Sequence, residues 1–266
     1  MMRRSLMVTA VGLGIMAVLS LGASPALALS FTGNYFVLAP DHPDTLGAID
    51  FATVPGLVGP ALDVGTGLPV YTGLVPASGA ITDLGVGNTI QWWTAHAGFV
   101  SADLSVGGGV TNTRSDAFVG NVLGGVGTFE TNFFAPEGGA NNQNGYRSVH
   151  WTGAFQVGVG GATVSLTADD DAWLFLNGAL VLDNGGVKAT SLATTDTQNL
   201  APGVYTVDLW FADRHQVQSG IIFSCEGCSE LEPIPEPATL LLFGTTLAGL
   251  GAVVRRRMKG QKAPVA

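Results

Sequence analysis

Residues 167–187, TADDDAWLFLNGALVLDNGGV, contain the pattern that decides the fold. Two short apolar runs, 173–176 (WLFL) and 179–182 (ALVL), flank the dipeptide Asn177-Gly178. An Asn-Gly pair between apolar runs is the strongest short-range signal of a β-hairpin, because both turn positions require a positive φ. The stretch therefore predicts two antiparallel strands joined by a two-residue turn.

Similar strand patterns occur on both sides of this hairpin. Short runs rich in apolar residues are bounded by Gly, Pro or Asn, whereas no sustained helical period occurs between the two ends of the chain. We therefore predict an all-β fold, an antiparallel β-sandwich. The other expected strands are 34–39, 90–94, 154–159, 162–167, 204–212 and 220–225.

Three of these segments carry more specific expectations. Residues 204–212 alternate as a half-buried strand would, with Asp208 on the exposed face. The Trp pair within 90–94 is expected in the core. Residues 101–127 are rich in Gly and predict either a long loop or edge strands.

Three adjacent carboxylates, residues 169–171, precede the hairpin. Two like charges about 4 Å apart repel by ~4 kcal/mol at the dielectric of a protein surface. Successive side chains of a strand point to opposite faces, so convergence of Asp169 and Asp170 requires irregular backbone, for instance a strained or cis peptide. A hard cation such as Ca²⁺ would offset the repulsion. The alternative is that the aspartates simply end a strand and solvate a loop.

The N-terminus has the three parts of a secretory signal peptide. Arg3 and Arg4 form a positive start, residues 6–21 are apolar, and small residues lead to Ala28. We expect residues 1–28 to be removed after Ala28 and the protein to be exported.

The C-terminus has the features of a membrane stop. Residues 238–254 contain no charge and are close to the minimum length of a membrane-spanning helix. Arg255, Arg256 and Arg257 follow at once, and positive charge at a helix end marks the cytoplasmic side. An exported chain would stop here with its body outside the cytoplasm.

This tail, residues 233–266, resembles the PEP-CTERM sorting signal. The matching features are Pro235, Glu236 and Pro237, followed by the apolar segment and the arginine cluster in that order. The resemblance implies recognition by an exosortase and removal of the helix, so that membrane anchoring is transient. It also implies delivery to the cell surface or to an exopolysaccharide matrix.

The body between these ends, residues 29–232, is strongly acidic. Of the 11 Lys and Arg residues of the chain, only Arg114, Arg147, Lys188 and Arg214 lie in it. Such a balance argues against nucleic acid and anionic membranes as partners. It is compatible with cation binding and with a hydrated matrix.

Cys225 and Cys228 are the two cysteines of the chain. In an exported protein this spacing favours a local disulfide that closes a tight loop. A zinc site would need two more ligands at suitable spacing, and a thioredoxin-like motif would need a βαβ context. We predict the disulfide and no catalytic role.

Residues 34–230 resemble the fibro-slime domain, a relative of the protective-antigen-type lectin sandwich. The block 167–187 is similar to that family's GDDDVWVFINGKLVVDLGGVH core, and 209–215 (LWFADRH) to its closing FFAERH-type loop. Earlier similarities are Asp41 to Asp44 and the Phe133-Phe134 pair. The chain departs from the family pattern at Thr45, Ala168 and Lys188.

The resemblance implies a calcium site. The lectin relatives bind Ca²⁺ with an adjacent Asp pair before the hairpin, complete the shell from another loop, and present the ion to sugar hydroxyls. It implies metal ligands at Asp169, Asp170 and Asp213, with residues 213–220 as the second loop. Further candidates for ligand contact are Asp171, Asn177, Asp183, Arg214, His215, Gln216, Gln218 and Ser219. For Arg214 and His215 we favour a salt bridge or hydrogen bond that fixes the loop, and an ordinary turn explains Asp183 equally well.

An enzyme is not expected. The sequence has no H-E-x-x-H, G-x-S-x-G or P-loop motif. Three contiguous aspartates are poor acid–base partners, because none has its own apolar pocket to raise its pKa. We expect a Ca²⁺-dependent carbohydrate-binding or adhesive module with a polysaccharide or other glycan as partner. The alternatives are a structural matrix protein whose ion only rigidifies loops and, more distantly, an exported glycosidase.

Overall fold

The structure is a computed structural model that describes residues 29–45, 47–103, 112–117, 122–124, 146–189, 193–215 and 219–231. The chain divides into two units, 1–230 and 231–266, and all described elements belong to the first. In chain order they are β1 (Ser30–Leu38), η1 (Val86–Asn88), β2 (Val100–Ala102), β3 (Thr113–Ala117), β4 (Val122–Gly124), β5 (Arg147–Val157), β6 (Ala162–Asp169), β7 (Asp171–Leu176), β8 (Ala179–Asn184), β9 (Asp196–Leu200), β10 (Gly203–Asp213), β11 (Gly220–Glu226) and β12 (Cys228–Ser229).

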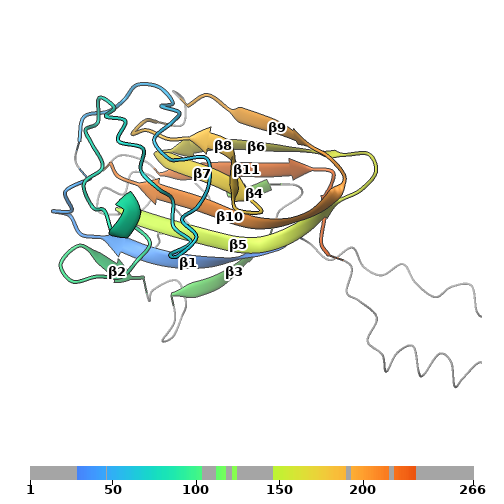
Figure 1. The fold of residues 1–266 in the computed structure, drawn as a ribbon, viewed down its shortest axis with the longest axis horizontal. Coiled ribbons are helices and arrows are strands. Elements are labelled where there is room, and N and C mark those ends of the chain that lie inside the picture. Colours follow the sequence, from blue (N-terminus) through green and yellow to red (C-terminus); the bar gives the residue numbers. More distant parts are fainter. Residues whose placement is uncertain are drawn as a thin grey trace, which may run out of the picture. The chain divides into compact units, whose positions relative to one another are not determined.

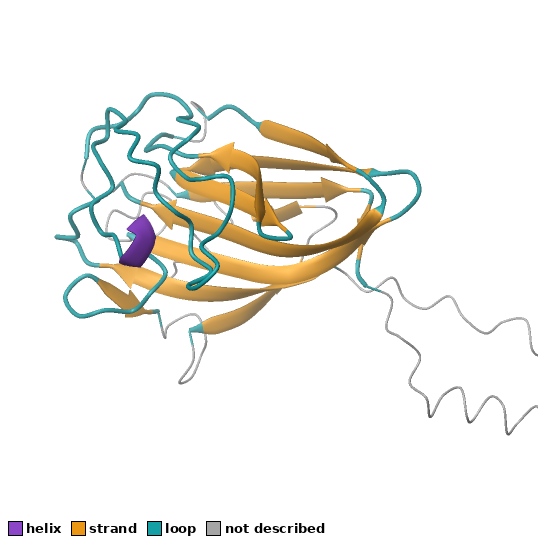
Figure 2. Cartoon of the chain, viewed as in Figure 1, coloured by secondary structure: helices purple, strands orange, loops and turns teal. Residues whose placement is uncertain are grey.

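The described strands form two antiparallel sheets (Figures 1 and 2). The larger sheet has the order β2-β1-β5-β10-β7-β8, with β3 also paired to β1 and β12 to β5. The smaller sheet has the order β4-β11-β6-β9. The predicted all-β antiparallel sandwich is confirmed.

The hairpin that the sequence marks most strongly joins β7 to β8. Leu176 pairs with Ala179, and the turn residues Asn177 and Gly178 have φ values of 53° and 78°. Two consecutive positive φ angles are what a two-residue hairpin turn of this type needs, because they match the twist of the flanking strands.

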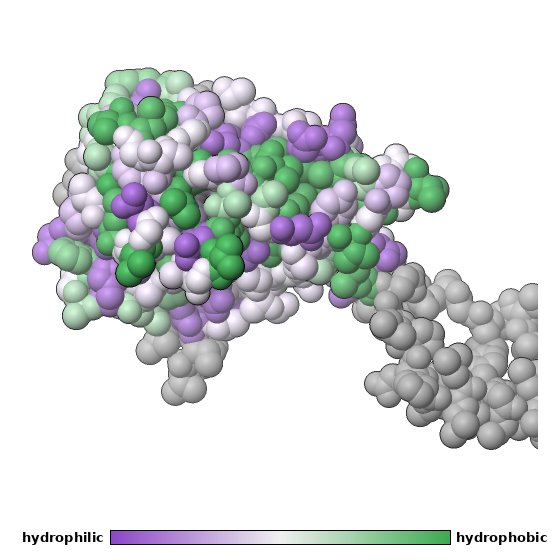
Figure 3. All heavy atoms as spheres, in the orientation of Figure 1, coloured by the Kyte–Doolittle hydropathy of each residue, from purple (hydrophilic) through white to green (hydrophobic). Residues whose placement is uncertain are grey.

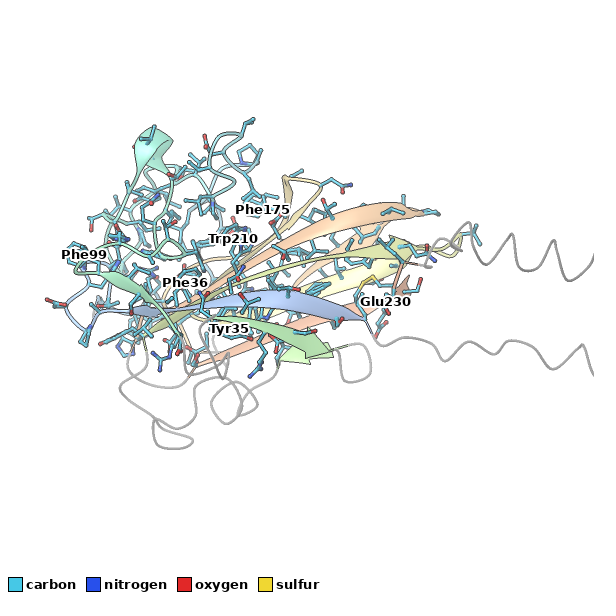
Figure 4. The ribbon with its side chains drawn as sticks, turned by 90° about the horizontal axis from the view of Figure 1, so that it is seen from below. Tyr35, Phe36, Phe99, Phe175, Trp210 and Glu230 are labelled. Atoms are coloured by element: carbon cyan, nitrogen blue, oxygen red, sulfur yellow. A yellow bond between two sulfur atoms is a disulfide. The ribbon has the colours of Figure 1, made fainter. Side chains whose placement is uncertain are left out.

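The larger sheet is buried on both faces. On β7, Leu174 and Leu176 belong to the core between the sheets, whereas Trp173 and Phe175 belong to a second core on the outer face. Trp210 of β10 lies in the same outer core, and Figure 4 shows it with Phe175 on the loop-covered side of the sheet. Residues 204–212 are therefore not simply half-buried, because the end of β10 is covered on both sides.

The outer core is covered by the long segment between β1 and β2, which crosses in front of the larger sheet (Figure 1). Its buried members include Leu57, Ile90 and the pair Trp92 and Trp93, which are 0% and 4% exposed. The expected core position of the Trp pair is confirmed. The expected strand at 90–94 is wrong: this stretch is a loop, and Ile90 makes only an isolated bridge to Leu84.

The strands at the edges of the sheets were the hardest to predict from the sequence. In the described part of 101–127, strands β2, β3 and β4 lie at sheet edges, which agrees with the second of the two expectations for this segment. Strand β9 was not expected, because its sequence, DTQNL, is polar and its side chains are mostly exposed. An edge strand of this kind has no apolar alternation to reveal it.

Among the connections that pass from one sheet to the other at one end of the sandwich, three carry charged residues that the structure describes. They are β6 to β7, β8 to β9 and β10 to β11. The strand registers place their starting points together, since Asp171 pairs with Ala212, Ala172 with Asn184 and Asp169 with Gly220. The adjacent carboxylates thus lie where three sheet-to-sheet connections meet.

No helix among the described residues is long and apolar enough to cross a membrane. The expected spanning segment, 238–254, lies outside those residues, as do Ala28, Pro235, Glu236, Pro237, Arg255, Arg256 and Arg257.

Candidate functional site at the strand ends

The adjacent carboxylates stand at the point where the chain changes sheets. Asp169 ends β6, Asp171 begins β7, and the peptide bond between Asp169 and Asp170 is cis. All three side chains are at most 1% exposed. The irregular backbone that the sequence required at this point is present, and the three aspartates are not a solvated acidic loop.

Asp170 connects this crossing to the other two. Its Oδ1 accepts a hydrogen bond from the backbone N–H of Lys188 at 2.9 Å, and its Oδ2 accepts one from the backbone N–H of Arg214 at 2.7 Å. Lys188 lies in the β8–β9 connection and Arg214 in the β10–β11 connection. One carboxylate therefore fixes the relative position of three loops.

Asp171 forms the buried ion pair of the site. Its Oδ2 accepts a hydrogen bond from Arg214 Nε at 2.7 Å, and its Oδ1 accepts one from the backbone N–H of Gly186 at 2.6 Å. Burial lowers the pKa of Arg214, but the charges of Asp171 and Asp170 outweigh this effect and raise it. The guanidinium also lies over the ring of Trp92, 4.8 Å from its centroid. At 2% exposure Arg214 is an internal counterion, which is the loop-fixing salt bridge that the sequence favoured over ligand contact.

Lys188 is the second internal cation. Its Nζ donates to the backbone oxygens of Asp170, Asn184 and Gly186 at 2.6, 2.9 and 3.1 Å, and the residue is 1% exposed. Burial lowers the pKa of its ammonium group. Sequence reasoning assigned Lys188 no role in the site. The available signal was that Lys188 is the single lysine between the two chain ends of an acidic body.

Asp213 ends β10 and completes the set of predicted metal ligands. It is 3% exposed and accepts the backbone N–H of His215 at 3.2 Å. Burial and the charges of Asp170 and Asp169 raise its pKa well above the ordinary value. Burial and the charge of Asp171 likewise raise the pKa of Asp170 to about 6. Asp213 thus lies close enough to Asp170 and Asp169 for their charges to act on it.

We refer to these buried charges as the strand-end cluster. Its described members are Asp169, Asp170, Asp171, Asp213, Lys188 and Arg214. Four carboxylates face two cations, so the fully ionised cluster carries two uncompensated negative charges. Buried charge without a partner costs several kcal/mol, on the order of the desolvation penalty of an ion. Burial raises the pKa values of Asp170 and Asp213, and the charges of the neighbouring carboxylates raise them further.

The donor set suits one hard divalent cation, because it offers oxygen atoms and a net charge of opposite sign. Among the described residues, no three His, Cys, Asp or Glu side chains converge in a metal-binding arrangement. A bound ion would therefore need backbone oxygens, waters or residues 216–218 to complete its shell. Gln216 and Gln218, two of the predicted contacts, lie outside the described residues.

Two further predicted ligand contacts are engaged by other groups of the structure. Asn177 is in the turn at the opposite end of β7, where its Oδ1 accepts the backbone N–H of Thr206 at 2.9 Å. Asp183 accepts Trp173 Nε1 at 2.9 Å and the backbone N–H of Gly56 at 2.6 Å, and so ties the covering segment to the sheet. Both side chains have structural partners that explain them.

The remaining predictions concern the rim of the cluster and the cysteines. His215 is half-buried beside Asp213, and Ser219 is 6% exposed at the end of the same connection. Cys225 and Cys228 form a disulfide between β11 and β12.

Comparison with known families identifies both parts of the chain. Residues 129–234 match the model of the PA14 domain, and residues 233–257 match the PEP-CTERM protein-sorting motif. The chain carries a PA14 domain followed by a PEP-CTERM sorting motif. The expected relationship to the protective-antigen-type sandwich is thereby confirmed. The PA14 match includes the whole strand-end cluster, whereas β1, β2 and the covering segment precede it.

Curated relatives share only a short region with this protein. Protein psiQ of Dictyostelium discoideum is 34% identical over 79 residues, which are 26% of this chain and 8% of that protein. Protein psiR is 38% identical over 64 residues (23% and 6%), and protein psiE 41% over 56 residues (20% and 11%), both from the same organism. The chain thus spans about a tenth or less of these relatives.

Solved structures give partial superpositions. A PA14 sugar-binding domain from an RTX adhesin is 14% identical, with 40% of this chain and 70% of that chain covered and a TM-score of 0.26. A β-glucosidase from Kluyveromyces marxianus, solved with glucose, is 23% identical, with 32% and 11% covered and a TM-score of 0.25.

Proposed function

We propose that the PA14 domain binds Ca²⁺ at the strand-end cluster and uses the ion to hold a saccharide at the cell surface. The observation that carries the proposal is the buried charge imbalance: four carboxylates face two cations, and one divalent ion makes up the difference. Asp169, Asp170 and Asp213 would hold the ion. Lys188 and Arg214 would keep the surrounding loops in place.

Each residue has a separate part in this proposal. Asp170 and Asp171 are already engaged by backbone N–H groups, which orient their carboxylates before an ion arrives. Preorganised oxygen ligands lose little conformational freedom on binding, which favours affinity. Asp169, Asp170 and Asp213 would hold a Ca²⁺ ion, which would supply coordination positions for neutral oxygen ligands such as sugar hydroxyls. His215, at the partly exposed rim, would adjoin the sugar.

The sorting motif sets the place where this binding would occur. The PEP-CTERM motif marks the protein as exported and sorted to the surface, with an exosortase as its processing partner. We infer that the anchor is transient and that the mature domain acts as an adhesive module on the envelope or in an exopolysaccharide matrix. No catalytic role is proposed, because the clustered carboxylates share one buried environment rather than occupying separate acid and base pockets.

A structural role for the ion is the second candidate. Asp170 joins three sheet-to-sheet connections, so an ion bound there would rigidify the end of the sandwich without touching a ligand. Such a protein would bind Ca²⁺ as strongly and would retain no glycan.

A glycan array separates these two candidates. The purified protein is applied to the array in Ca²⁺ and in EDTA, with the Asp213→Asn variant as a second sample. Glycans retained by the wild type in Ca²⁺ only, and not by the variant, would support the lectin function. Calcium-dependent stabilisation without any retained glycan would favour the structural role. Hydrolysis of an arrayed glycan would contradict the expectation that the protein is no enzyme.

A further inference from the structure

A cleft lies on the outer face of the larger sheet, away from the strand-end cluster. It has a volume of about 690 Å³ and lies between the covering segment and strands β5 and β10. Its walls include Gln91, Thr94, His150, Asp208 and Trp210. Asp208 precedes Asp213 by five positions on β10, which is roughly 16 Å along an extended strand. The two sites are therefore separate.

The floor of the cleft is a stacked pair of rings. His150 and Trp210 pair across β5 and β10, and their rings are parallel, with centroids 3.4 Å apart and planes inclined by 5°. Trp210 also makes an edge-to-face contact with Trp93 of the covering segment, whose ring centroid is 4.9 Å away. His150 keeps 18% of its side chain exposed, whereas Trp210 is 2% exposed. The imidazole is thus the outer layer of a rigid aromatic stack.

Polar groups surround this platform. Asp208 Oδ1 lies 2.9 Å from His150 Nε2, and 26% of the Asp208 side chain is exposed. The amide nitrogen of Gln91 donates to Thr89 O at 3.1 Å, which leaves the amide oxygen as an acceptor. The Asp208 carboxylate and the Gln91 amide oxygen are therefore acceptors available to the hydroxyl groups of a ligand.

This chemistry selects a class of ligand. A flat ring beside a carboxylate and an amide oxygen suits a molecule with one apolar C–H face and several hydroxyl donors. Pockets of ~300–1,000 Å³ with a few fixed polar groups are typical of small-molecule sites. No Lys or Arg is among the described residues that line the cleft, so an anionic ligand would meet the Asp208 carboxylate with no ammonium or guanidinium group to pair with. Neutral saccharides combine the required features.

We propose that this cleft is a second saccharide site, specific for neutral sugars and independent of metal. It goes beyond the function proposed above, because it uses none of the strand-end cluster. Part of its wall, residues 66–94, belongs to the covering segment, which precedes the PA14 match. The site is therefore a feature of this chain's own outer layer. Hydrophilic and hydrophobic residues are mixed over this face of the molecule (Figure 3).

The test uses the full purified protein in EDTA, so that calcium-dependent binding does not contribute to the measurement. Maltose, cellobiose and lactose are titrated while tryptophan fluorescence and binding heat are recorded, with an oligogalacturonate as the anionic comparison. At least one neutral disaccharide should bind. Asp208→Asn and His150→Ala should each weaken that binding about tenfold or more, the loss expected for a charged hydrogen bond or a stacking surface.

Glu226→Gln is the matched control, because Glu226 is an exposed acid on β11 of the other sheet. It should bind as the wild type does. If His150→Ala fails to fold, as judged by its melting temperature, Asp208→Asn still decides the outcome. Absence of binding to all three disaccharides, binding unchanged in both cleft variants, or preference for the anionic sugar would each overturn the proposal. None of these results bears on calcium binding at the strand ends, which the EDTA removes from the measurement.

Discussion

Asp171 and Asp213 are chemically identical and lie in the same cluster, yet their surroundings give them opposite roles. Asp171 has a guanidinium partner at 2.7 Å, whereas burial and the charges of Asp170 and Asp169 raise the pKa of Asp213 well above its ordinary value. Removing a paired charge leaves its partner buried and alone, whereas removing an unfavourably placed charge relieves repulsion. The two residues therefore provide a matched pair of substitutions.

Asp171→Asn should destabilise the metal-free protein by about 3 kcal/mol. This is the lower end of the range for breaking a buried ion pair, because the substitution also relieves repulsion on Asp170. Urea unfolding of wild type and variant in EDTA measures the difference. Glu226→Gln, an exposed acid outside the cluster, serves as the control and should change the free energy of unfolding by less than about 0.5 kcal/mol. A variant as stable as the wild type would contradict the assigned ion pair.

The pH dependence of the metal-free protein should reflect the raised carboxyl pKa values. In the folded state Asp170 keeps its proton up to a pKa of about 6, whereas in the unfolded chain an Asp releases it near ~3.9. The folded state thus binds more protons in this window, and stability falls as the pH rises through it. Asp213, whose pKa is also raised, acts in the same direction.

The stability of Asp213→Asn relative to the wild type should therefore increase as the pH rises above about 4, since Asn does not titrate. Melting temperatures of both proteins in EDTA, measured from pH 4 to pH 7, check this. A difference that shrinks with rising pH would mean that Asp213 is stabilised in its charged form.

At the same scale, the sequence located the acidic pair but not its counterions. Adjacent aspartates before a hairpin can be recognised directly in the sequence. Because successive side chains of a strand point to opposite faces, their convergence predicts an irregular backbone. The three backbone oxygens that accept hydrogen bonds from Lys188 lie up to 18 residues away from it in the sequence. Because backbone oxygens are present at every residue, no sequence pattern marks these three as its partners. Arg214 was placed at the correct loop, but its pairing with Asp171 across 43 residues required the strand registers.

At the scale of elements, the hairpin between β7 and β8 illustrates what local sequence determines. The Asn177-Gly178 turn was predictable because positive φ restricts the choice of residue to very few. The segment 90–94 shows the opposite case. Its apolar and aromatic residues suggested a strand, but they are buried because they cover the outer face of a sheet, and burial alone does not require extended pairing.

Gly178→Ala should destabilise the protein by about 1 kcal/mol. Its φ of 78° lies in the left-handed region, where a β-carbon costs ~1–2 kcal/mol, although no atom lies within 4 Å of the added group. Gly158→Ala is the control, because that glycine has equally open space and no positive φ. Equal effects of the two substitutions on the urea midpoint would indicate that the turn is not of the assigned type.

At the scale of the whole domain, the sandwich has two hydrophobic cores and one end at which buried charged residues gather. The larger sheet separates an inner core from an outer core, which explains why β7 is buried at every position. Three sheet-to-sheet connections converge at one end and bring together charges from β6, β7, β10 and the loop after β8. Sequence reasoning predicted the sandwich and an irregular backbone at Asp169 and Asp170. The outer layer was not predicted, because a covering loop segment has no periodicity of its own.

The exported location is consistent with this arrangement. A surface protein meets millimolar rather than submicromolar free calcium, so a site with weak affinity in the range of extracellular modules, ~10⁻⁴–10⁻³ M, would still be filled. In the strand-end cluster, Lys188 and Arg214 already hold the loops in place through their hydrogen bonds. Calcium binding would therefore add stability to a domain that is already folded.

The most direct test of the account is the melting temperature of the wild type and of Asp213→Asn, each measured in EDTA and in 2 mM Ca²⁺ (about the upper end of the affinity range of extracellular calcium modules) at pH 7. In EDTA the variant should melt at the same temperature as the wild type or higher, because it lacks one uncompensated charge. Calcium should raise the melting temperature of the wild type and leave the variant unchanged. A wild type that does not respond to calcium, or a variant that responds equally, would contradict calcium binding at the strand-end cluster.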